Sequence, residues 1–474
     1  MIRAPLPKFA GRAARENGSI LILVLWIAFG LTAIALYFAH SMSVELRAAD
    51  NRVAGMEASQ AIEGAAVYVS NILANLATPD TLPNPINFHV ENVKVGNAHF
   101  WLIGRDTNVY QTPIARDHPF WGLVDEASKL NLNTATPDQL EWLPGMGLNP
   151  NLNDYIYDWR TTSTTPTNGG AKSETYSIQA IPYNCKNTNY ESEDELRLVY
   201  GMNMDLLYGE DANLNGMLDP NENDGDALPP HDNQDGQLNS GLLEYVTVWT
   251  HEGNVGSNGI SRVVVTNLDE LTDLISNNFP SDLQYLEPFQ AQAGPVGPGG
   301  GRGGLPGGAG GVGGAEANPP NSVLDFYVRS GMPQSQFQQI EPYLMNGNTN
   351  GLVNVTDASA TVLAAVLADT NTAATIVNYR QSTPPLTPSI SWLTSAIGSD
   401  DTVAQKIGPL LTPYTFQYTA DIAAVGHNGR GYRRVRFVFD TSSGIPQIVY
   451  RQDLTYLGWA LGKNLYDQLA SNTQ

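Results

Sequence analysis

The chain of 474 residues has a single cysteine, Cys185, and few charged side chains. One thiol cannot form a disulfide within the chain, so a hydrophobic core or bound metal must stabilise the fold. Charged residues make up 15% of the sequence, and 25 Lys and Arg stand against 47 Asp and Glu, a formal net charge of −22. So acidic a surface repels nucleic acid and attracts cations. The length allows about two to four domains.

Catalytic motifs are also missing. The seven histidines form no HExxH pair, and the chain has no CxxC, GxSxG or Walker loop. A GxGxxG match at Gly299, Gly301 and Gly304 falls in a stretch, 294–314, in which 13 of 21 residues are glycine. No strand is expected before it and no helix after it, so residues 293–320 are interpreted as a flexible linker rather than a dinucleotide site. The sequence therefore indicates a protein that is not an enzyme.

One apolar segment near the N-terminus is long enough to cross a membrane. No charged residue occurs from Asn17 to Val44, and nearly every residue from Ile20 to Ala39 is apolar. About 20 such residues in a helix span a bilayer core of about 30 Å. Four basic residues and one acid precede the segment, a bias that predicts a cytoplasmic N-terminus and a translocated remainder. These flanking residues are Arg3, Lys8, Arg12, Arg15 and Glu16.

Three interpretations of this segment are open: a secretory signal peptide cut near Ala39-His40-Ser41, a plain signal anchor, or a prepilin-type segment. The apolar run is longer than the roughly 7–15 residues typical of signal peptides. The Gly18-Ser19 junction resembles the type IV prepilin cleavage site, after which the apolar segment stays on the mature chain. We therefore expect a leader over residues 1–18 and cleavage between Gly18 and Ser19.

An amphipathic stripe continues directly after the apolar segment and favours the prepilin interpretation. Apolar residues recur at alternating spacings of four and three, which is typical of one helix face. They are Ala58, Ile62, Ala65, Val69, Ile72 and Leu76. We expect one continuous helix from Ser19 to Ala77, ended by Thr78-Pro79 because proline cannot donate the helix hydrogen bond. A transmembrane and amphipathic helix over 19–80 is the pilin design.

Alternating apolar residues predict strands at both ends of the remaining chain. They occur between Phe88 and Ile103 and again at 415–425, 432–440 and 446–454. We expect an α+β fold in which a pilin-like long N-terminal helix packs on an antiparallel sheet. Residues 81–130 and 405–460 would form that sheet, and 131–400 would be a large, mostly helical insertion between its strands.

The insertion contains a diverged repeat. NLNTATPDQL (131–140) aligns with NVTDASATVL (354–363), and each is followed by a segment that ends in an aromatic residue and arginine, at 154–160 and 374–380. The segment 262–275 is a weaker third copy. Each copy reads as an extended segment, a helix-capping side chain and an apolar helix.

The segment DANLNGMLDPNE, Asp211 to Glu222, fits the calcium-loop pattern. Its predicted ligands alternate along the chain, Gly216 permits the sharp turn, and Met217 offers its main-chain carbonyl. The ligand set is Asp211, Asn213, Asn215, Met217, Asp219 and Glu222. The alternative is a solvated acidic loop. We predict Ca²⁺, because calcium takes six to eight oxygens at about 2.3–2.6 Å.

A second acidic cluster follows within the same predicted calcium region, 211–244. Its candidate metal ligands are Asp224, Asp226, Asp232 and Asp235. It resembles half of a calcium loop, because Leu242 stands where the twelfth-position glutamate is expected. A second or shared metal site is a hypothesis at this point.

Several stretches together resemble the type II secretion (general secretion pathway) protein K family of minor pseudopilins. They are GLVDEASKLNLNTA (122–135), the DWR ending at Arg160, ESEDELRLVYGM (191–202) and the VNV to YR unit at 353–380. Leu23 agrees, because it stands at the fifth mature position, where pilins carry Glu and protein K characteristically does not. The glycine-rich stretch lies outside the resemblance.

The resemblance implies a structural protein at the tip of a periplasmic pseudopilus that supports export of folded proteins. It implies assembly with minor pseudopilins I and J, cleavage by prepilin peptidase, methylation of Ser19 and possible contact with secreted substrates. It also implies a single-pass inner-membrane protein with a cytoplasmic N-terminus and a periplasmic C-terminal domain. Calcium binding is a further trait of the family.

A rival resemblance links residues 130–147 to the helix-hairpin-helix unit of competence DNA-binding proteins. There, a hairpin such as Leu143 to Gly147 offers main-chain N–H groups to phosphate. Phosphate binders add flanking Lys or Arg, but acids dominate here, and Lys129 and Arg160 are the only bases nearby. We therefore expect no nucleic-acid partner, and keep a membrane-anchored DNA-uptake protein as the alternative.

Overall fold

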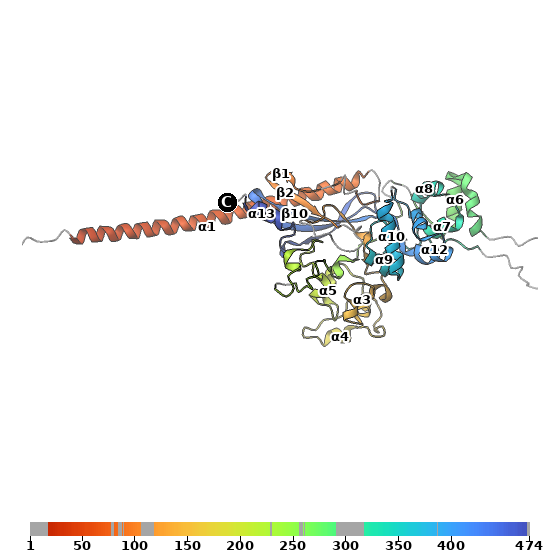
Figure 1. Ribbon diagram of the computed structural model, residues 1–474, viewed down its shortest axis with the longest axis horizontal. Coiled ribbons are helices and arrows are strands. Elements are labelled where there is room, and N and C mark those ends of the chain that lie inside the picture. Colours follow the sequence, from red (N-terminus) through yellow and green to blue (C-terminus); the bar gives the residue numbers. More distant parts are fainter. Residues whose placement is uncertain are drawn as a thin grey trace, which may run out of the picture.

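The structure is a computed structural model that describes residues 18–76, 80–83, 88, 90–105, 118–227, 230–255, 259, 261–290, 317–385 and 387–471. One long helix, α1 (Gly18–Ala74), projects from a folded head (Figure 1). At about 1.5 Å per residue its 57 residues extend about 86 Å. The expected continuous helix is confirmed, although it ends at Ala74. Most of the leader (1–17) and much of the glycine-rich linker (291–316) lie outside the described residues.

The head is built on one antiparallel sheet whose strands come from both ends of the chain. Its order is β1-β2-β10-β11-β12, and a short strand, β3, pairs with the other end of β10. The strands are β1 (Val93–Val95), β2 (Ala98–Ile103), β3 (Val124–Asp125), β10 (Gln417–Val425), β11 (Arg433–Asp440) and β12 (Gln447–Asp453). In the register, Ile422 lies opposite both Leu102 and Val435. The predicted α+β class, with strands from before and after the insertion, is confirmed.

Helix α1 packs on one face of this sheet through small side chains. Ala58, Ala61 and Ala65 are fully buried, which lets the helix axis approach the sheet closely. Larger side chains, such as Ile62 of the helix and Phe437 of the sheet, fill the remaining space and are almost fully buried. The stripe of apolar residues predicted from the sequence therefore forms the interface between helix and sheet.

The insertion consists of three repeat units, each closed by a short parallel strand pair. Repeat unit 1 (130–247) pairs β4 with β5, repeat unit 2 (263–345) pairs β6 with β7, and repeat unit 3 (353–412) pairs β8 with β9. The strands are β4 (Leu130–Asn131), β5 (Val246–Thr247), β6 (Val263–Val264), β7 (Leu344–Met345), β8 (Val353–Asn354) and β9 (Leu411–Thr412). The third copy suspected at 262–275 is thus a complete unit.

Each repeat unit runs from its first strand through helices and a 3-10 turn to its second strand. The 3-10 turns that directly precede the second strands are η5 (Leu242–Glu244), η7 (Glu341–Tyr343) and η9 (Gly408–Leu410). The helices are α2 (Pro137–Leu140), α3 (Leu152–Arg160), α4 (Ser173–Ser177), α5 (Met204–Tyr208), α6 (Leu268–Asn278), α7 (Val323–Ser330), α8 (Gln334–Ile340), α9 (Ala360–Leu367), α10 (Thr370–Ser382), α11 (Leu393–Ile397) and α12 (Asp401–Ile407). A last helix, α13 (Lys463–Ser471), follows the sheet.

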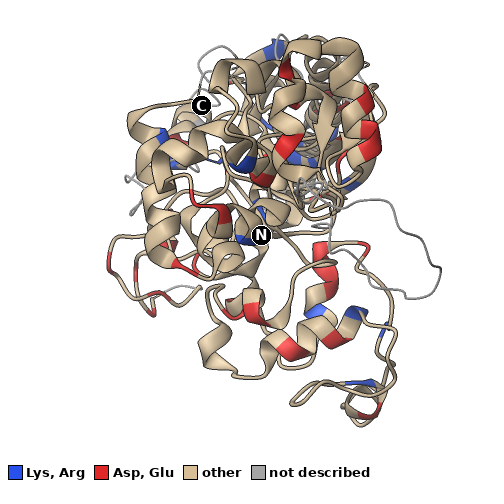
Figure 2. Ribbon diagram, turned by 90° about the vertical axis from the view of Figure 1, so that its right-hand side faces the viewer, with Lys and Arg blue, Asp and Glu red and all other residues tan. Residues whose placement is uncertain are grey.

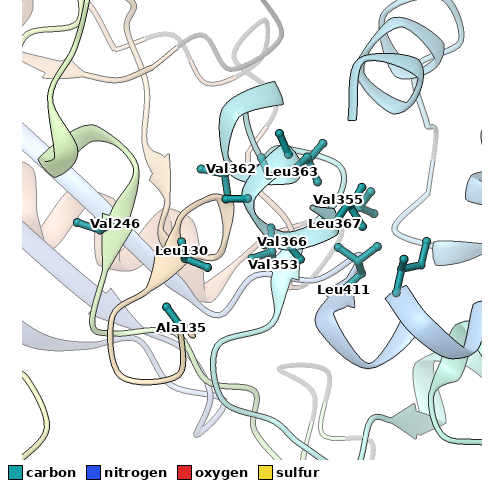
Figure 3. Packing of buried hydrophobic residues seen from close by; sticks show 14 of the residues in the cluster. Leu130, Ala135, Val246, Val353, Val355, Val362, Leu363, Val366, Leu367 and Leu411 are labelled. Carbon is teal, nitrogen blue, oxygen red and sulfur yellow. The ribbon is translucent and has the colours of Figure 1, made fainter. Parts of the chain in front are cut away.

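Equivalent side chains perform the same tasks in different units. Thr136, Asn267 and Ser359 cap the first helices of units 1, 2 and 3 through their side-chain oxygens. Arg160 donates to the carbonyl of Ala135 (2.6 Å), as Arg380 does to that of Val355 (2.9 Å). All three units share one hydrophobic core, in which residues beside β4 and β8 meet (Figure 3).

Candidate calcium loop and its contacts with the sheet

The predicted calcium loop, Asp211 to Glu222, lies in repeat unit 1 between α5 and the 3-10 turn η4 (Pro220–Glu222). Side-chain oxygens fold its first half by accepting main-chain N–H groups. Asp211 accepts from Asn215 and Gly216 (both 2.9 Å), and Asn215 accepts from Met217 (2.8 Å). Gly216 has φ +71°, and a Cβ there would lie 2.9 Å from the side chain of Arg105. The sharp turn that calcium loops require is therefore present.

The second half of the loop closes back on the first. Glu222 accepts from the main-chain N–H of Ala212 (3.0 Å) and of Asp219 (2.9 Å). One carboxylate oxygen of Asp219 accepts from the amides of Asn213 (2.7 Å) and Asn215 (2.9 Å). The structure thus brings the five predicted side-chain ligands together, and Met217 lies within the same turn.

Burial disfavours the ionised form of the acids in this loop. Asp211 is 0% and Glu222 1% exposed. Burial, and then the charge of Asp211, raise the pKa of Glu222 to about 9, while burial raises the pKa of Asp211 to about 6. Burial also raises the pKa of Asp219. A bound cation would reverse these shifts, because it favours the ionised form of each acid.

The oxygens of the loop fit calcium better than a softer metal. Three carboxylates, two amides and a main-chain carbonyl are hard oxygen donors, and the loop contains no Cys or His. Within the part of the chain that the structure describes, no group of three or more His, Cys, Asp or Glu side chains is arranged to hold a metal ion. A cation here would therefore depend on the amide and carbonyl oxygens as well as the acids.

The second acidic cluster is more open. Asp232 accepts from the main-chain N–H of Asp224 (2.9 Å) and of Gly225 (2.8 Å). The side chain of Asp226 is 92% exposed and lies 3.2 Å from His231, and Asp235 accepts from the N–H of Gln237. The structure brings Asp224 and Asp232 into contact, whereas Asp226 and Asp235 face solvent.

Two arginines that the sequence analysis did not single out attach the loop to the sheet. Arg434 of β11 is fully buried and binds both oxygens of Asp421 on β10 (2.8 and 2.6 Å). The same guanidinium donates to the carbonyls of Asn213 and Leu214, and Arg105 also donates to Leu214 (2.9 Å). The only signal of this contact in the sequence was an arginine and an aspartate on the same face of two neighbouring strands.

The loop also touches the segment that follows the sheet. The amide of Asn213 donates to the carbonyl of Trp459 (3.2 Å), and that of Asn215 to the carbonyl of Ala460 (3.3 Å). Ala460 and Leu461 are fully buried against the sheet. This twelve-residue loop of repeat unit 1 therefore contacts both the sheet and the C-terminal segment.

The predicted membrane segment forms the free part of α1. The helix from Ile20 to Ala74 is long and apolar enough to cross a membrane, with a mean hydropathy of 2.6 in its most apolar window, and none of that window is buried in the head. Length and composition thus suggest a single-pass membrane anchor. Gly18 and Ser19, the predicted cleavage junction, begin the helix, whereas residues 1–17 are outside the described residues.

The hairpin of the rival helix-hairpin-helix interpretation lies between α2 and α3. Its main-chain N–H groups at Met146 and Leu148 donate to Leu143 and Gly145. Both nearby bases are engaged, since Lys129 pairs with Glu126 (2.9 Å) and Arg160 binds a carbonyl. Figure 2 shows acidic residues at many positions along the ribbon of the head. The arrangement offers little to a phosphate.

Comparisons with known proteins give a family match over part of the chain and a weak structural likeness. No curated protein matches the chain. A crystal structure of the GspK-GspI-GspJ complex from the Type 2 Secretion System of enterotoxigenic Escherichia coli aligns with 8% identity and a TM-score of 0.39, covering 83% of this chain and 94% of the other.

The family match is carried by repeat unit 1. Residues 129–208 match the family model described as type II secretion system (T2SS), protein K, and the match ends just before the calcium loop begins. The helix capped by Thr136, the aromatic and arginine ending at Arg160 and the segment 191–202 all lie inside it. The resemblance seen in the sequence is thereby supported over residues 129–208, where this chain is similar to type II secretion system protein K.

Proposed function

We propose that this chain is a structural subunit at the tip of a type II secretion pseudopilus, where it supports the export of folded proteins. The observation that carries the proposal is the combination of a long exposed apolar helix with a head enlarged by three repeat units. The exposed helix can pack beside helices of the same kind, whereas so large a head obstructs stacking of a further subunit above it. A place at the end of the filament accommodates both features.

The N-terminal segment supports a specific membrane arrangement. The basic flank favours a cytoplasmic N-terminus, an inner-membrane span and a periplasmic head. Prepilin peptidase would cut between Gly18 and Ser19, and Ser19 would then be methylated. Removal of four basic residues and one acid takes the formal charge from −22 to −22 − 3 = −25.

Minor pseudopilins I and J are the proposed partners. The related crystal structure is described as a complex of GspK with GspI and GspJ. In this chain the exposed helix, with side chains such as Leu23 and Phe29 more than half exposed, supplies a surface for neighbouring helices. Secreted substrates are possible further contacts of the head.

We also propose that the loop from Asp211 to Glu222 binds Ca²⁺. Asp211, Asn213, Asn215, Asp219 and Glu222 would hold the ion with side-chain oxygens, and Met217 with its carbonyl. Bound calcium supplies positive charge where buried carboxylates otherwise repel one another. The cluster at Asp224, Asp226, Asp232 and Asp235 is a weaker candidate for a second ion, because two of its acids face solvent.

Assembly is tested by co-purification of the full chain with minor pseudopilins I and J from its own secretion system, with calcium and with a chelator. We expect a stable complex in calcium. A full chain that is folded and calcium-loaded but binds neither partner contradicts the proposed assembly.

Calcium is tested separately by hydrogen exchange. Chelation is expected to lower protection across residues 205–245 and leave the helix–sheet interface near Ile62 unchanged. Unchanged protection across 205–245 contradicts the calcium proposal. The Asp232→Asn variant, in the open cluster, is the matched control for Asp211→Asn: only the latter is expected to abolish the response.

Alternatives from other classes are less well supported. DNA binding lacks free bases beside the hairpin, so a salt-sensitive gel shift with the full chain would be needed to restore it. We propose a structural role rather than catalysis, in keeping with the protein K family.

A further inference from the structure

The point where α1 leaves the head is held by the turn between β10 and β11. Side chains just before Ala54 are exposed, whereas Ala54 itself is fully buried. At Gly426 and Gly431 a Cβ would collide with the main chain of Ala54 and Gly55. The turn therefore rests directly on the backbone of α1, at the point where the buried part of the helix begins.

One histidine of this turn lies between two acids of the helix. His427 Nδ1 is 2.7 Å from Glu57 Oε2, and its Nε2 is 2.9 Å from Asp50 Oδ1. The main-chain N–H of His427 also donates to Glu57 (2.9 Å). Asp50 and Glu57 are seven residues apart, about two helical turns, so they lie on one face of α1. The ring thus bridges the helix on both sides of its exit point.

The chemistry of imidazole makes this bridge depend on charge. Neutral imidazole has one N–H donor and one acceptor nitrogen, whereas imidazolium donates from both nitrogens. Ionised carboxylates only accept, so both contacts form together only when His427 is protonated. The hydrogen bonds to Glu57 and then Asp50 accordingly raise the pKa of His427 above its ordinary value.

The other charged groups at the junction are two arginines at the turn and the two acids of α1. Arg430 pairs with Asp50, and the guanidinium of Arg433 lies 3.3 Å from where a Cβ of Gly55 would be. Asn97, from the turn between β1 and β2, hydrogen-bonds Glu57, and α13 places the apolar Leu469 against Gly429. His427 is therefore the group whose charge changes in the range where proteins function.

We propose that His427, Asp50 and Glu57 form a pH-sensitive latch that sets how firmly the exposed half of α1 is held to the head. Below the titration of His427 both acids are bound, and α1 is fixed through residues 50–57. Above it one contact is lost, because an acceptor nitrogen then faces a carboxylate. Arg430 still binds Asp50, so the helix is loosened rather than released. The latch is independent of calcium and of the tip position.

The direction in which the latch depends on pH follows from the raised pKa of His427. A group whose pKa is raised by folding stabilises the folded arrangement at low pH, and this contribution disappears as the pH rises through the raised value. The latch is therefore closed in mildly acidic surroundings and opens in alkaline ones.

The test is hydrogen exchange of the full chain in lipid nanodiscs between pH 5.5 and 8.5, corrected for intrinsic exchange. Protection of residues 48–58 is expected to fall by about two- to fivefold with rising pH, a small change because exposed ion pairs are weak. In His427→Gln, protection is expected to be low and independent of pH. In the matched control His231→Gln, which removes an exposed histidine of the acidic loop, the wild-type profile is expected.

A second measurement does not depend on any variant. Nuclear magnetic resonance titration of the His427 ring in the wild-type chain is expected to give a midpoint above the ordinary value of about 6.5. A midpoint at or below that value overturns the latch. So does a His427→Gln chain that keeps the wild-type pH profile at residues 48–58.

Discussion

The interface between α1 and the sheet and the interface between the insertion and the sheet are built from opposite materials. The buried part of the first consists of alanines, aliphatic residues and aromatics, with Ala58, Ala65 and Phe437 almost fully buried. Its ion pairs lie at the more exposed edges of the interface. The second is made largely by ions: Arg434 binds Asp421 and two loop carbonyls, and Glu126 joins Thr419 of the sheet to Thr247 of the insertion.

The difference shows which of the two interfaces depends on the pH and the metal ions of the solution. Apolar contacts of the kind made by α1 are insensitive to pH and metal ions, and they are non-directional. Buried charges stabilise only when every partner is present, because an unpaired buried ion is costly. The interface between the insertion and the sheet should therefore respond to single charge changes, to pH and to calcium. The packing of the buried residues of α1 on the sheet should not.

The largest effect is expected from breaking the ionic interface at its centre. Arg434→Leu leaves the buried Asp421 with only the more distant Arg436 (3.8 Å) as an ion-pair partner, and it is expected to lower the free energy of unfolding by about 3–5 kcal/mol. Chemical denaturation of the full chain in detergent, followed by tryptophan fluorescence, measures this. The matched control is Arg451→Leu on the neighbouring strand, whose exposed partner is Glu63; there about 0–1 kcal/mol is expected. Equal losses in the two variants would refute the contrast.

A cavity in the apolar interface gives the next effect. Ile62→Ala is expected to cost about 2–5 kcal/mol, because it leaves a gap between α1 and the sheet. The same loss is expected with calcium and with a chelator, as measured by denaturation in each condition. A loss that changes strongly on chelation would mean that the two interfaces are coupled.

A smaller effect is expected from a buried acid of the insertion. Burial raises the pKa of Glu341 to about 8, and one of its oxygens has no hydrogen-bond partner, while the other accepts from Ile390 (2.7 Å). Because the pKa is raised by folding, the stabilising protonated form is lost as the pH rises through about 8.

The variant Glu341→Gln keeps an oxygen for Ile390 but cannot ionise. Between pH 6 and pH 9 it is expected to gain about 2–3 kcal/mol of stability relative to the wild-type chain, because Glu341 is ionised throughout this range when unfolded but only above about pH 8 when folded. Thermal denaturation at pH 6 and pH 9 makes the comparison. A variant that gains no stability over the wild-type chain between pH 6 and pH 9 would show that folding does not raise the pKa of Glu341.

The smallest effect concerns the repeat units. Thr136 and Ser359 cap equivalent helices in units 1 and 3. Replacement of either by Ala is expected to cost about 1 kcal/mol. Denaturation of the two variants, with the exposed Ser471→Ala as a control, tests whether the caps are equivalent; losses that differ by several-fold would contradict this.

The sequence was informative where one periodicity dominates. The apolar stripe of α1 and the alternating strands at 417–440 could be predicted, because each pattern repeats along a single element. The calcium-loop motif at 211–222 could be recognised in the sequence because its candidate ligands are close together along the chain, and calcium binding itself stays a prediction. The three repeat units were visible only through short similarities, since the strand that closes each unit comes 58 to 116 residues later as a two-residue segment.

What could not be predicted are contacts between distant charges. Arg434 and Leu214 are 220 residues apart, and His427 and Asp50 are 377 apart. Neither pair leaves a local pattern, because an arginine or histidine at a strand end is ordinarily a solvated surface residue. Only the folded chain shows that Arg434 is fully buried and that His427 faces α1.

The measurement that tests the account most directly is the intact mass and N-terminal sequence of the chain recovered from the membranes of its own cell. The account predicts that it starts at a methylated Ser19 and keeps α1. A chain that starts near Met42, without the apolar half of that helix, would contradict assembly through pseudopilin helices.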